Sequence, residues 1–131
     1  MSIAILEHTN YSVSDPKKTA QHLVDVFGWH IRWEGAAKDD GYTIHVGSDA
    51  SYLALYTPDR NGTADKAHQN SYKTIGGLNH LAITVDDIDA TEARVTAAGF
   101  TPHLHADYEP GKRFYFYDND HVEYEVVSYT S

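Results

Sequence analysis

Two segments of the chain, His8-Thr-Asn-Tyr-Ser-Val-Ser-Asp15 and His80-Leu-Ala-Ile-Thr-Val-Asp-Asp87, share a spacing that decides the fold. Each opens with histidine, has valine five residues later and ends on aspartate two residues beyond that. Further along, Phe27-Gly28-Trp29 lies over Ala98-Gly99-Phe100 with a slip of a single residue. Self-similarity of this kind is the mark of a repeated structural unit. The chain is therefore expected to contain two copies of one module.

The repeat sets the domain organisation. It gives a first module of about 1–57, a linker of about 58–73 and a second module of about 75–131. The linker is polar and contains Pro, Gly, Asn and Asp, a composition typical of loops. The whole chain of 131 residues has the length of one compact domain. We therefore expect a single domain over residues 1–131.

Each module is predicted to fold as βαβββ, which places the chain in the α+β class. In the first module, a β-rich run at 3–13 leads into Ser14-Asp15-Pro16, a signal for the start of a helix. Apolar residues then recur at helical spacing until Gly28, where the helix is expected to end. These apolar residues are Ala20, Leu23, Val24 and Phe27.

The second module follows the same plan, with a β-rich run at 78–85 and a helix at about 87–98 that buries Ile88, Val95 and Ala98. Gly99 is expected to end this helix. Three short strands follow the helix in each module. They are predicted at 29–35, 41–47 and 51–57, and at 100–106, 112–118 and 122–129.

Alternation along the strands predicts one apolar and one polar sheet face, because successive residues of a strand point to opposite sides. The apolar face carries Tyr11, Val13, Leu81, Ile83 and Val85, and is expected to pack beneath the helices. The opposite face is too polar for a core and is expected to line a water-accessible cup. Its residues are His8, Asn10, Ser12, Tyr52, Ala54, Tyr56, His80, Ala82, Thr84, Arg113, Tyr115, Tyr117, Glu123, Glu125 and Val127.

A divalent metal site is predicted on this polar face. His8 and His80 occupy the same position of the repeat, and pseudo-twofold symmetry would bring them together, with Glu125 on a neighbouring strand. Two imidazoles and one carboxylate suit Fe(II), Mn(II), Ni(II) or Zn(II). The alternative for any single strand histidine is a hydrogen-bonded structural role. The other histidines, at positions 22, 30, 45, 68, 103, 105 and 121, are expected at the surface or in loops.

Composition limits the partners. The net charge is −9, from 10 Lys and Arg against 19 Asp and Glu, so the surface repels phosphate backbones and anionic membranes. No nucleic-acid or membrane partner is expected. The sequence has no membrane-length apolar run and no signal-peptide layout at its start, which predicts a cytoplasmic protein. With no cysteine, neither disulfides nor thiolate metal sites can form.

The sequence resembles the vicinal-oxygen-chelate superfamily, which includes glyoxalase I, extradiol dioxygenases, fosfomycin-resistance enzymes and bleomycin-binding proteins. The resemblance rests on the repeated His-x-x-x-x-Val-x-Asp pattern, on the two helix ends and on the segment Phe114-Tyr-Phe-Tyr-Asp118-Asn-Asp-His-Val-Glu-Tyr-Glu125. In the family this last segment follows Asp-Pro-Asp-Gly-Asn-x-Ile-Glu, so the family's ligand glutamate maps onto Glu125. Asn119, His121 and Val122 depart from the pattern.

The resemblance implies an enzyme, of lyase, isomerase, transferase or dioxygenase type, whose metal chelates two neighbouring oxygens of a small substrate. Glyoxalase I adds a fourth ligand at or near the position of Ala54, which cannot ligate, so that chemistry is disfavoured. Glu123 and Tyr115 are then the candidate catalytic residues. The candidate substrate-binding residues are Arg113, Tyr117, Tyr52 and Tyr56.

Two further expectations concern the rival function and the assembly. A metal-free module that sequesters a small aromatic drug, of the bleomycin-resistance type, is favoured by the acidic charge and by the tyrosine-lined cup, because aromatic faces attract cations. Family members of this length are usually homodimers, so the cup is expected to be completed or exchanged between two chains, with His8 from one chain and His80 and Glu125 from the other.

Overall fold

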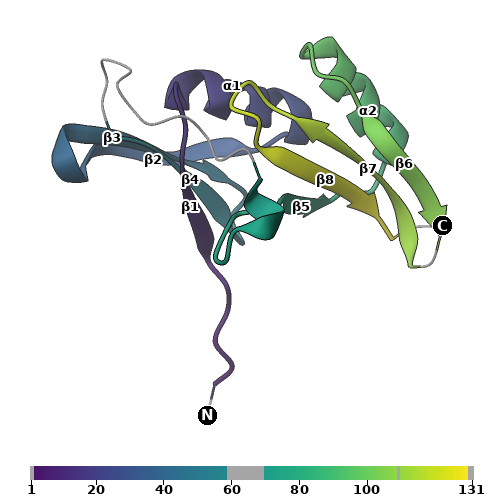
Figure 1. Ribbon diagram of the computed structural model, residues 1–131, viewed down its shortest axis with the longest axis horizontal. Helices are drawn as coiled ribbons and strands as arrows, with labels where there is room; N and C mark the ends of the chain where they lie inside the picture. Colours follow the sequence, from purple (N-terminus) through teal and green to yellow (C-terminus); the bar gives the residue numbers. More distant parts are fainter. Residues whose placement is uncertain (1, 59–69, 109, 130–131) are drawn as a thin grey trace. The chain divides into compact units, whose positions relative to one another are not determined.

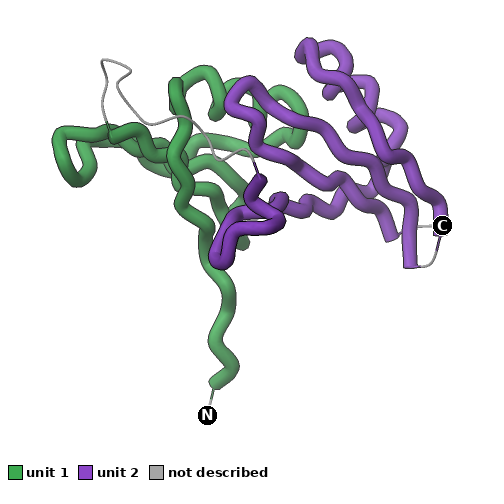
Figure 2. Tube along the Cα trace, in the orientation of Figure 1, with its two compact units in different colours: residues 1–65 green, residues 66–131 purple. Residues whose placement is uncertain are grey.

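The computed structural model describes residues 2–58, 70–108 and 110–129. The chain forms two compact units, residues 1–65 and 66–131, drawn in different colours in Figure 2. The predicted linker at 58–73 spans the boundary between them, and most of it lies outside the described residues. Each unit is described by itself below.

Unit 1 is a four-stranded sheet with one helix on one face (Figure 1). Its elements are β1 (His8–Ser12), α1 (Pro16–Phe27), β2 (His30–Ala37), the 3₁₀ turn η1 (Lys38–Asp40), β3 (Gly41–Gly47) and β4 (Tyr52–Thr57). The strand order is β1-β4-β3-β2. β1 runs parallel to β4, and the other pairs are antiparallel.

Unit 2 repeats this topology strand for strand. Its elements are the 3₁₀ turn η2 (Ser71–Lys73), β5 (Leu81–Thr84), α2 (Ile88–Ala97), β6 (His103–Tyr108), β7 (Gly111–Tyr117) and β8 (Glu123–Ser128). The order β5-β8-β7-β6 again has one parallel pair, between β5 and β8. The predicted α+β class with two βαβββ modules is thereby confirmed.

The helix signals act as the sequence indicated. Asp15 accepts a hydrogen bond from the Lys18 amide, and Asp87 accepts one from the Ala90 amide, so each carboxylate caps the start of its helix. Gly28 ends α1 in the left-handed conformation. The α1 helix is 12 residues long and α2 is 10, so neither helix in the described part of the chain has the length and apolar character to span a membrane.

The core of each unit lies between its helix and the apolar sheet face. In unit 1, α1 buries Val26 in full, whereas Val24 and Phe27, which the sequence placed on the buried face, are only half-buried. In unit 2, Val95 and Thr91 are the buried residues of α2, while Ile88 and Ala98 are half-buried. The buried apolar side chains of the sheets are Tyr11, Val13, Ile44, Val46, Leu53, Leu55, Phe114, Phe116, Tyr124, Val126 and Val127.

The opening strands are shorter than predicted. β1 begins at His8, and Ile3, Ile5 and Leu6 are exposed instead of continuing the strand. The reason is the partner strand: β4 begins at Tyr52, directly opposite His8, so the ladder ends there. β5 likewise begins at Leu81, opposite Tyr124, which leaves His80 one residue ahead of the strand.

The turn between β7 and β8, where the sequence departs from the family pattern, is well formed. Both oxygens of the Asp118 carboxylate are engaged, one by the amides of Asp120 and Val122 and the other by the Tyr124 hydroxyl. Burial raises the pKa of Asp118, against the effect of these hydrogen bonds. His121 stands where the family has glycine, and its φ is 62°, a value that favours glycine.

The strained backbone at His121 makes a testable difference. We expect His121→Gly to exceed His121→Ala in free energy of unfolding by about 1 kcal/mol, because both variants lack the ring but only glycine adopts this φ without a Cβ clash. Urea denaturation followed by circular dichroism measures the difference. At Asn119, in the same turn but without positive φ, the same pair should show no advantage for glycine. Equal stabilities of the two variants at position 121 contradict this account.

Candidate functional site

Unit 2 brings most of the predicted site residues onto one sheet face. The register of β5 with β8 pairs Ala82 with Glu125, and the register of β7 with β8 pairs Tyr115 with Glu125. Side chains two residues apart on these strands share a face. His80 and Glu123, each two residues from these positions, therefore lie on the face that holds Glu125.

His80 and Glu125 are in direct contact. The Nε2 atom of His80 lies 3.1 Å from Oε1 of Glu125. The other carboxylate oxygen, Oε2, accepts a hydrogen bond of 2.9 Å from Nη1 of Arg113. Glu125 and Glu123 are each 7% exposed. Of these two buried carboxyl groups, Glu125 is the one that pairs with the Arg113 guanidinium.

Arg113, a predicted substrate contact, is half-buried, and its guanidinium contacts other side chains of unit 2. Besides the bond to Glu125, it lies 5.1 Å from the centre of the Tyr108 ring. Its Nε atom is buried and has no hydrogen-bond partner among the described residues. These contacts place Arg113 beside the Glu125 carboxylate, where it engages one oxygen and leaves the other facing His80.

Tyr72 completes the surroundings of His80. Its hydroxyl donates a hydrogen bond of 2.6 Å to Oε1 of Glu123 and lies 2.9 Å from Nδ1 of His80. The bond to Glu123 raises the pKa of Tyr72 to about 12, so the hydroxyl keeps its proton at neutral pH. Tyr72 belongs to η2, in the segment that the sequence placed in a linker loop. Nothing in its sequence context marked it as a site residue.

Two further tyrosines line the same face. Tyr115 presents its ring to the edge of His80 at a centroid distance of 5.7 Å, and burial is the main cause of its raised pKa. Tyr117 stacks between His103 and His121, at 5.1 Å and 4.4 Å. A hydrogen bond to Glu123 raises the pKa of Tyr117. His103, which the sequence placed at the surface, lies 3.8 Å from Glu123 through its Nε2 atom.

Unit 1 carries the other predicted ligand, His8, at the start of β1. Its Nδ1 atom lies 2.8 Å from Oε1 of Glu7, and its ring stacks on Tyr52 at 4.8 Å. The Tyr52 hydroxyl donates to the same oxygen of Glu7. These hydrogen bonds, that of His8 foremost, lower the pKa of Glu7. Glu7 thus orients His8, although no pattern in the sequence singles Glu7 out.

The ring stack of unit 1 extends across the sheet. His45 lies 4.6 Å from Tyr52 and 5.3 Å from Trp33, and the Arg32 guanidinium lies 4.5 Å from the Tyr52 ring. His45, which was expected at the surface or in a loop, is the middle ring of the row Trp33, His45 and Tyr52. Tyr56, predicted to bind substrate, instead donates a hydrogen bond of 2.7 Å to the backbone oxygen of Lys38.

The shared topology identifies which residues of the two units correspond. The register pairs Ala54 with Asn10 in unit 1, as it pairs Glu125 with Ala82 in unit 2, so Ala54 holds the position of Glu125. By the same pairing Thr43 holds the position of Arg113. Unit 1 therefore carries the predicted ligand His8, but at the positions that correspond to Glu125 and Arg113 it has neither a carboxylate nor a cation.

The donor set of unit 2 fits a divalent metal ion. Metal–nitrogen and metal–oxygen bonds are about 2.0–2.2 Å long. Octahedral coordination sets adjacent bonds at right angles, which places the two donor atoms about 3 Å apart. The 3.1 Å between Nε2 of His80 and Oε1 of Glu125 matches that spacing. Over the described residues, neither unit contains by itself a group of three or more His, Cys, Asp or Glu side chains placed to hold a metal. A site built on His80 and Glu125 thus needs a further ligand.

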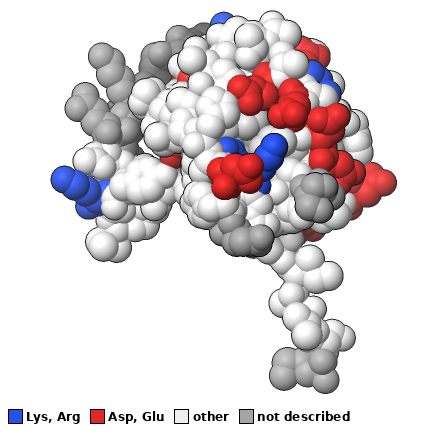
Figure 3. Space-filling view, turned by 90° about the vertical axis from the view of Figure 1, so that its right-hand side faces the viewer, with Lys and Arg blue, Asp and Glu red and all other residues white. Residues whose placement is uncertain are grey.

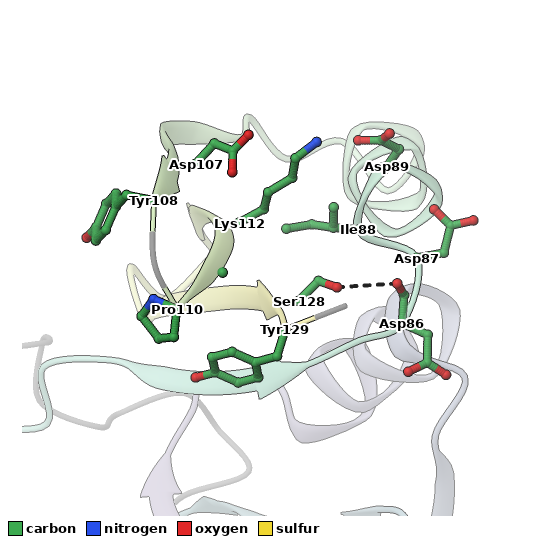
Figure 4. Close-up of a pocket in the computed structure, with 11 residues that line it drawn as sticks. Asp86, Asp87, Ile88, Asp89, Asp107, Tyr108, Pro110, Lys112, Ser128 and Tyr129 are labelled. Atoms are coloured by element: carbon green, nitrogen blue, oxygen red, sulfur yellow. Dashed lines mark hydrogen bonds between the residues drawn. The ribbon is translucent and has the colours of Figure 1, made fainter. Parts of the chain in front are cut away.

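A separate hollow lies on another part of unit 2 (Figure 4). Its volume is about 810 Å³, and it is bounded by the start of α2 and the turn between β6 and β7. Asp86, Asp87, Asp89 and Asp107 surround Lys112 there, and acidic side chains gather on this side of the protein (Figure 3). The Asp87 carboxylate caps α2. None of the predicted site residues lines this hollow.

Comparisons with known structures agree with this fold. A glyoxylase/bleomycin resistance protein/dioxygenase domain from Frankia sp. EAN1pec superimposes with a TM-score of 0.79 at 19% identity, covering 97% of this chain and 98% of that chain. FosX from Listeria monocytogenes, complexed with Mn(II) and sulfate, gives 0.74 at 20% identity, with coverage of 98% and 95%. TnmS3, an antibiotic-binding protein from Streptomyces sp. CB03234, gives 0.73 at 19% identity and covers 98% of both chains.

The sequence comparisons identify the family. No curated protein matches the sequence. The model of one family matches residues 5–126, which is nearly the whole chain and includes His8, His80 and Glu125. The chain therefore belongs to the Glyoxalase/Bleomycin resistance protein/Dioxygenase superfamily.

Proposed function

We propose that this protein is a divalent-metal-dependent enzyme that binds a small substrate through two neighbouring oxygen atoms. The observation that carries the proposal is the contact of His80 with Glu125, whose donor atoms have the spacing of adjacent metal ligands. The Mn(II) in the related FosX structure supports a metal in this fold. His8 is the proposed third ligand, from its matching position in the repeat.

The orientation of both histidines supports this ligand set. In each, Nδ1 faces an acceptor: Oε1 of Glu7 for His8, and the Tyr72 hydroxyl oxygen for His80. Metal-ligating histidines usually bind through one ring nitrogen while the other donates a hydrogen bond of this kind. The Nε2 atoms are then the proposed ligand atoms of both histidines.

When bound, the metal would act as a Lewis acid that stabilises negative charge developing on a substrate oxygen. The residues of this chain then have separate roles. Arg113 holds the Glu125 carboxylate, and Tyr115 forms a wall beside His80. Glu123 is the proposed group for proton transfer, with Tyr117 and Tyr52 as substrate contacts. Which reaction type follows, lyase, isomerase, transferase or dioxygenase, depends on the substrate.

A second candidate function is binding without catalysis. The row of Trp33, His45 and Tyr52 forms an aromatic surface on unit 1, and Trp33 is 54% exposed. Such a surface suits a planar, cationic drug, and TnmS3 is an antibiotic-binding protein of this fold. Under this hypothesis the protein binds its ligand equally well after treatment with chelator. Quenching of Trp fluorescence by a planar cationic dye, before and after chelation, separates the two functions.

Metal content tests the enzyme proposal directly. We expect protein purified without chelator to hold about one divalent ion per chain, measured by inductively coupled plasma mass spectrometry. His8→Ala, His80→Ala and Glu125→Gln should each lose most of it while the circular dichroism spectrum is retained, because removal of one of three protein ligands leaves the site incomplete. If both histidine variants keep stoichiometric metal, the ligand set is wrong.

Glu123→Gln is the matched control for Glu125→Gln. Both residues lie on the same face of β8 and are buried to the same degree, but only the Glu125 carboxylate contacts Nε2 of His80. We expect the change at position 123 to leave most of the metal bound. If Glu123→Gln loses as much metal as Glu125→Gln, or more, the assignment of Glu125 as the ligand from β8 is wrong.

We further propose a homodimer that shares its sites, with His8 from one chain and His80 and Glu125 from the other. Mixing His8→Ala chains with Glu125→Gln chains tests this. Under subunit exchange, each heterodimer has one site with both lesions and one intact site, so metal binding should recover to about half of one ion per chain in the heterodimer. No recovery after exchange, verified by native mass spectrometry, places each site within one chain.

A further inference from the structure

We propose that Tyr72 and Glu123 form a relay that sets the tautomer of His80, with the proton on Nδ1 and with Nε2 unprotonated and open to a metal. The inference rests on the proposed function, because it explains how His80 is kept ready to ligate. Neither Tyr72 nor Glu123 touches the metal in this scheme. Toward His80, both act as positioning residues, and the proton transfer proposed for Glu123 is a separate role.

The single hydrogen of the Tyr72 hydroxyl determines the tautomer of His80. The Tyr72 hydroxyl carries one hydrogen and has two polar neighbours, Oε1 of Glu123 at 2.6 Å and Nδ1 of His80 at 2.9 Å. A carboxylate can only accept, so the hydroxyl hydrogen is donated to Glu123. The hydroxyl oxygen is then left as an acceptor. The contact with Nδ1 is a hydrogen bond only if Nδ1 carries the proton.

The other side of the ring shows why this choice matters. Nε2 of His80 faces Oε1 of Glu125 at 3.1 Å. If Nε2 carried the proton, it would donate to Glu125, and the two ligand atoms would be tied to each other. With the proton on Nδ1, two lone pairs face one another instead, an arrangement that a cation between them stabilises. The relay therefore opposes closure of the ligand pair and favours metal binding.

The opposite partner is fixed as well. Arg113 engages Oε2 of Glu125, which leaves Oε1 as the oxygen that faces His80. Tyr72 itself is 60% exposed, so burial of its ring contributes little to holding it in place. Its hydroxyl contacts are what connect η2 to the face that carries His80 and Glu123.

The tautomer of His80 is measurable without metal. On full-length protein treated with chelator, ¹⁵N-detected NMR near pH 8 should show a pyrrole-type Nδ1 and a pyridine-type Nε2 for His80. The two signals are assigned to His80 by their absence from the spectrum of His80→Ala. In Tyr72→Phe, we expect Nε2 to become the protonated nitrogen, because the hydrogen bond to Glu125 then has no competitor. The affinity for Mn(II), measured by calorimetry, should fall about 10- to 100-fold.

Three variants separate the relay from a structural effect. Tyr117→Phe removes a hydroxyl that also bonds Glu123 but belongs to a ring stacked on His103, and it should leave the His80 tautomer unchanged. Glu123→Leu keeps Tyr72 but removes its acceptor. The hydroxyl is then free to turn and donate to Nδ1, so this variant should shift the proton to Nε2 as Tyr72→Phe does. Glu123→Gln retains an acceptor oxygen and should keep the wild-type tautomer.

The outcomes distinguish this inference from the proposed function. The relay is supported if Nε2 is pyridine-type in the wild-type protein and becomes protonated in Tyr72→Phe. If the wild-type protein shows this behaviour but fails to bind Mn(II), the relay stands while the metal proposal fails. A wild-type protein that binds Mn(II) but keeps its His80 tautomer and affinity in Tyr72→Phe overturns the relay alone. His80 protonated on both nitrogens in the metal-free protein near pH 8 also overturns it.

Discussion

The parallel pairing of β5 with β8 is the constraint on which the site of unit 2 depends. It sets Ala82 opposite Glu125 and so brings His80, two residues earlier, within 3.1 Å of that carboxylate. A slip of one residue would turn every side chain of β8 to the other face. The buried apolar residues Tyr124 and Val126 prevent that slip, because it would move them out of the core and Glu125 into it. The core of the unit thus fixes the position of a polar site.

The same pairing in unit 1 gives a different result, because two corresponding positions hold residues of different chemistry. Where unit 2 has Arg113 and Glu125 in a buried ion pair, unit 1 has Thr43 and Ala54. A buried carboxylate left without its cationic partner costs about 3–5 kcal/mol, so such a pair is expected to be present or absent together. The repeat therefore preserves the backbone and one histidine in each half, while it confines the charged part of the site to unit 2. Two copies of one fold thus carry different sets of candidate ligands.

The fold was largely predictable from the sequence, because the signals for helix starts, helix ends and strands are local and each occurs once in each half of the repeat. Helix caps at Asp15 and Asp87, helix ends at Gly28 and Gly99, and strand alternation each recur at the same place in both halves. The errors lie where a partner strand decides the outcome. Ile3 to Leu6 has the composition of a strand, but β4 has nothing opposite those residues. Strand composition does not report where the neighbouring strand begins.

The site was predictable only in part, for a related reason. His80, Glu123, Glu125, Arg113 and Tyr115 were found because alternation and register place them on one face. Their roles were less accessible, since the Arg113 side chain has the length to reach either a substrate or Glu125, and only the structure shows the second. Tyr72 was missed altogether, because it comes from a 3₁₀ turn in a segment with no periodicity.

That omission follows from how such sites are built. The proposed metal ligands lie on regular strands or next to them, where a repeat in the sequence reveals them. The groups that orient these ligands need only reach them. Glu7 does so from the residue next to His8, and Tyr72 does so from eight residues before His80. The two halves of the repeat therefore share a histidine but solve its orientation differently, with an exposed carboxylate in one unit and a tyrosine backed by a buried carboxylate in the other. Orientation is the part of the site that symmetry does not constrain, and it is where the two units have diverged.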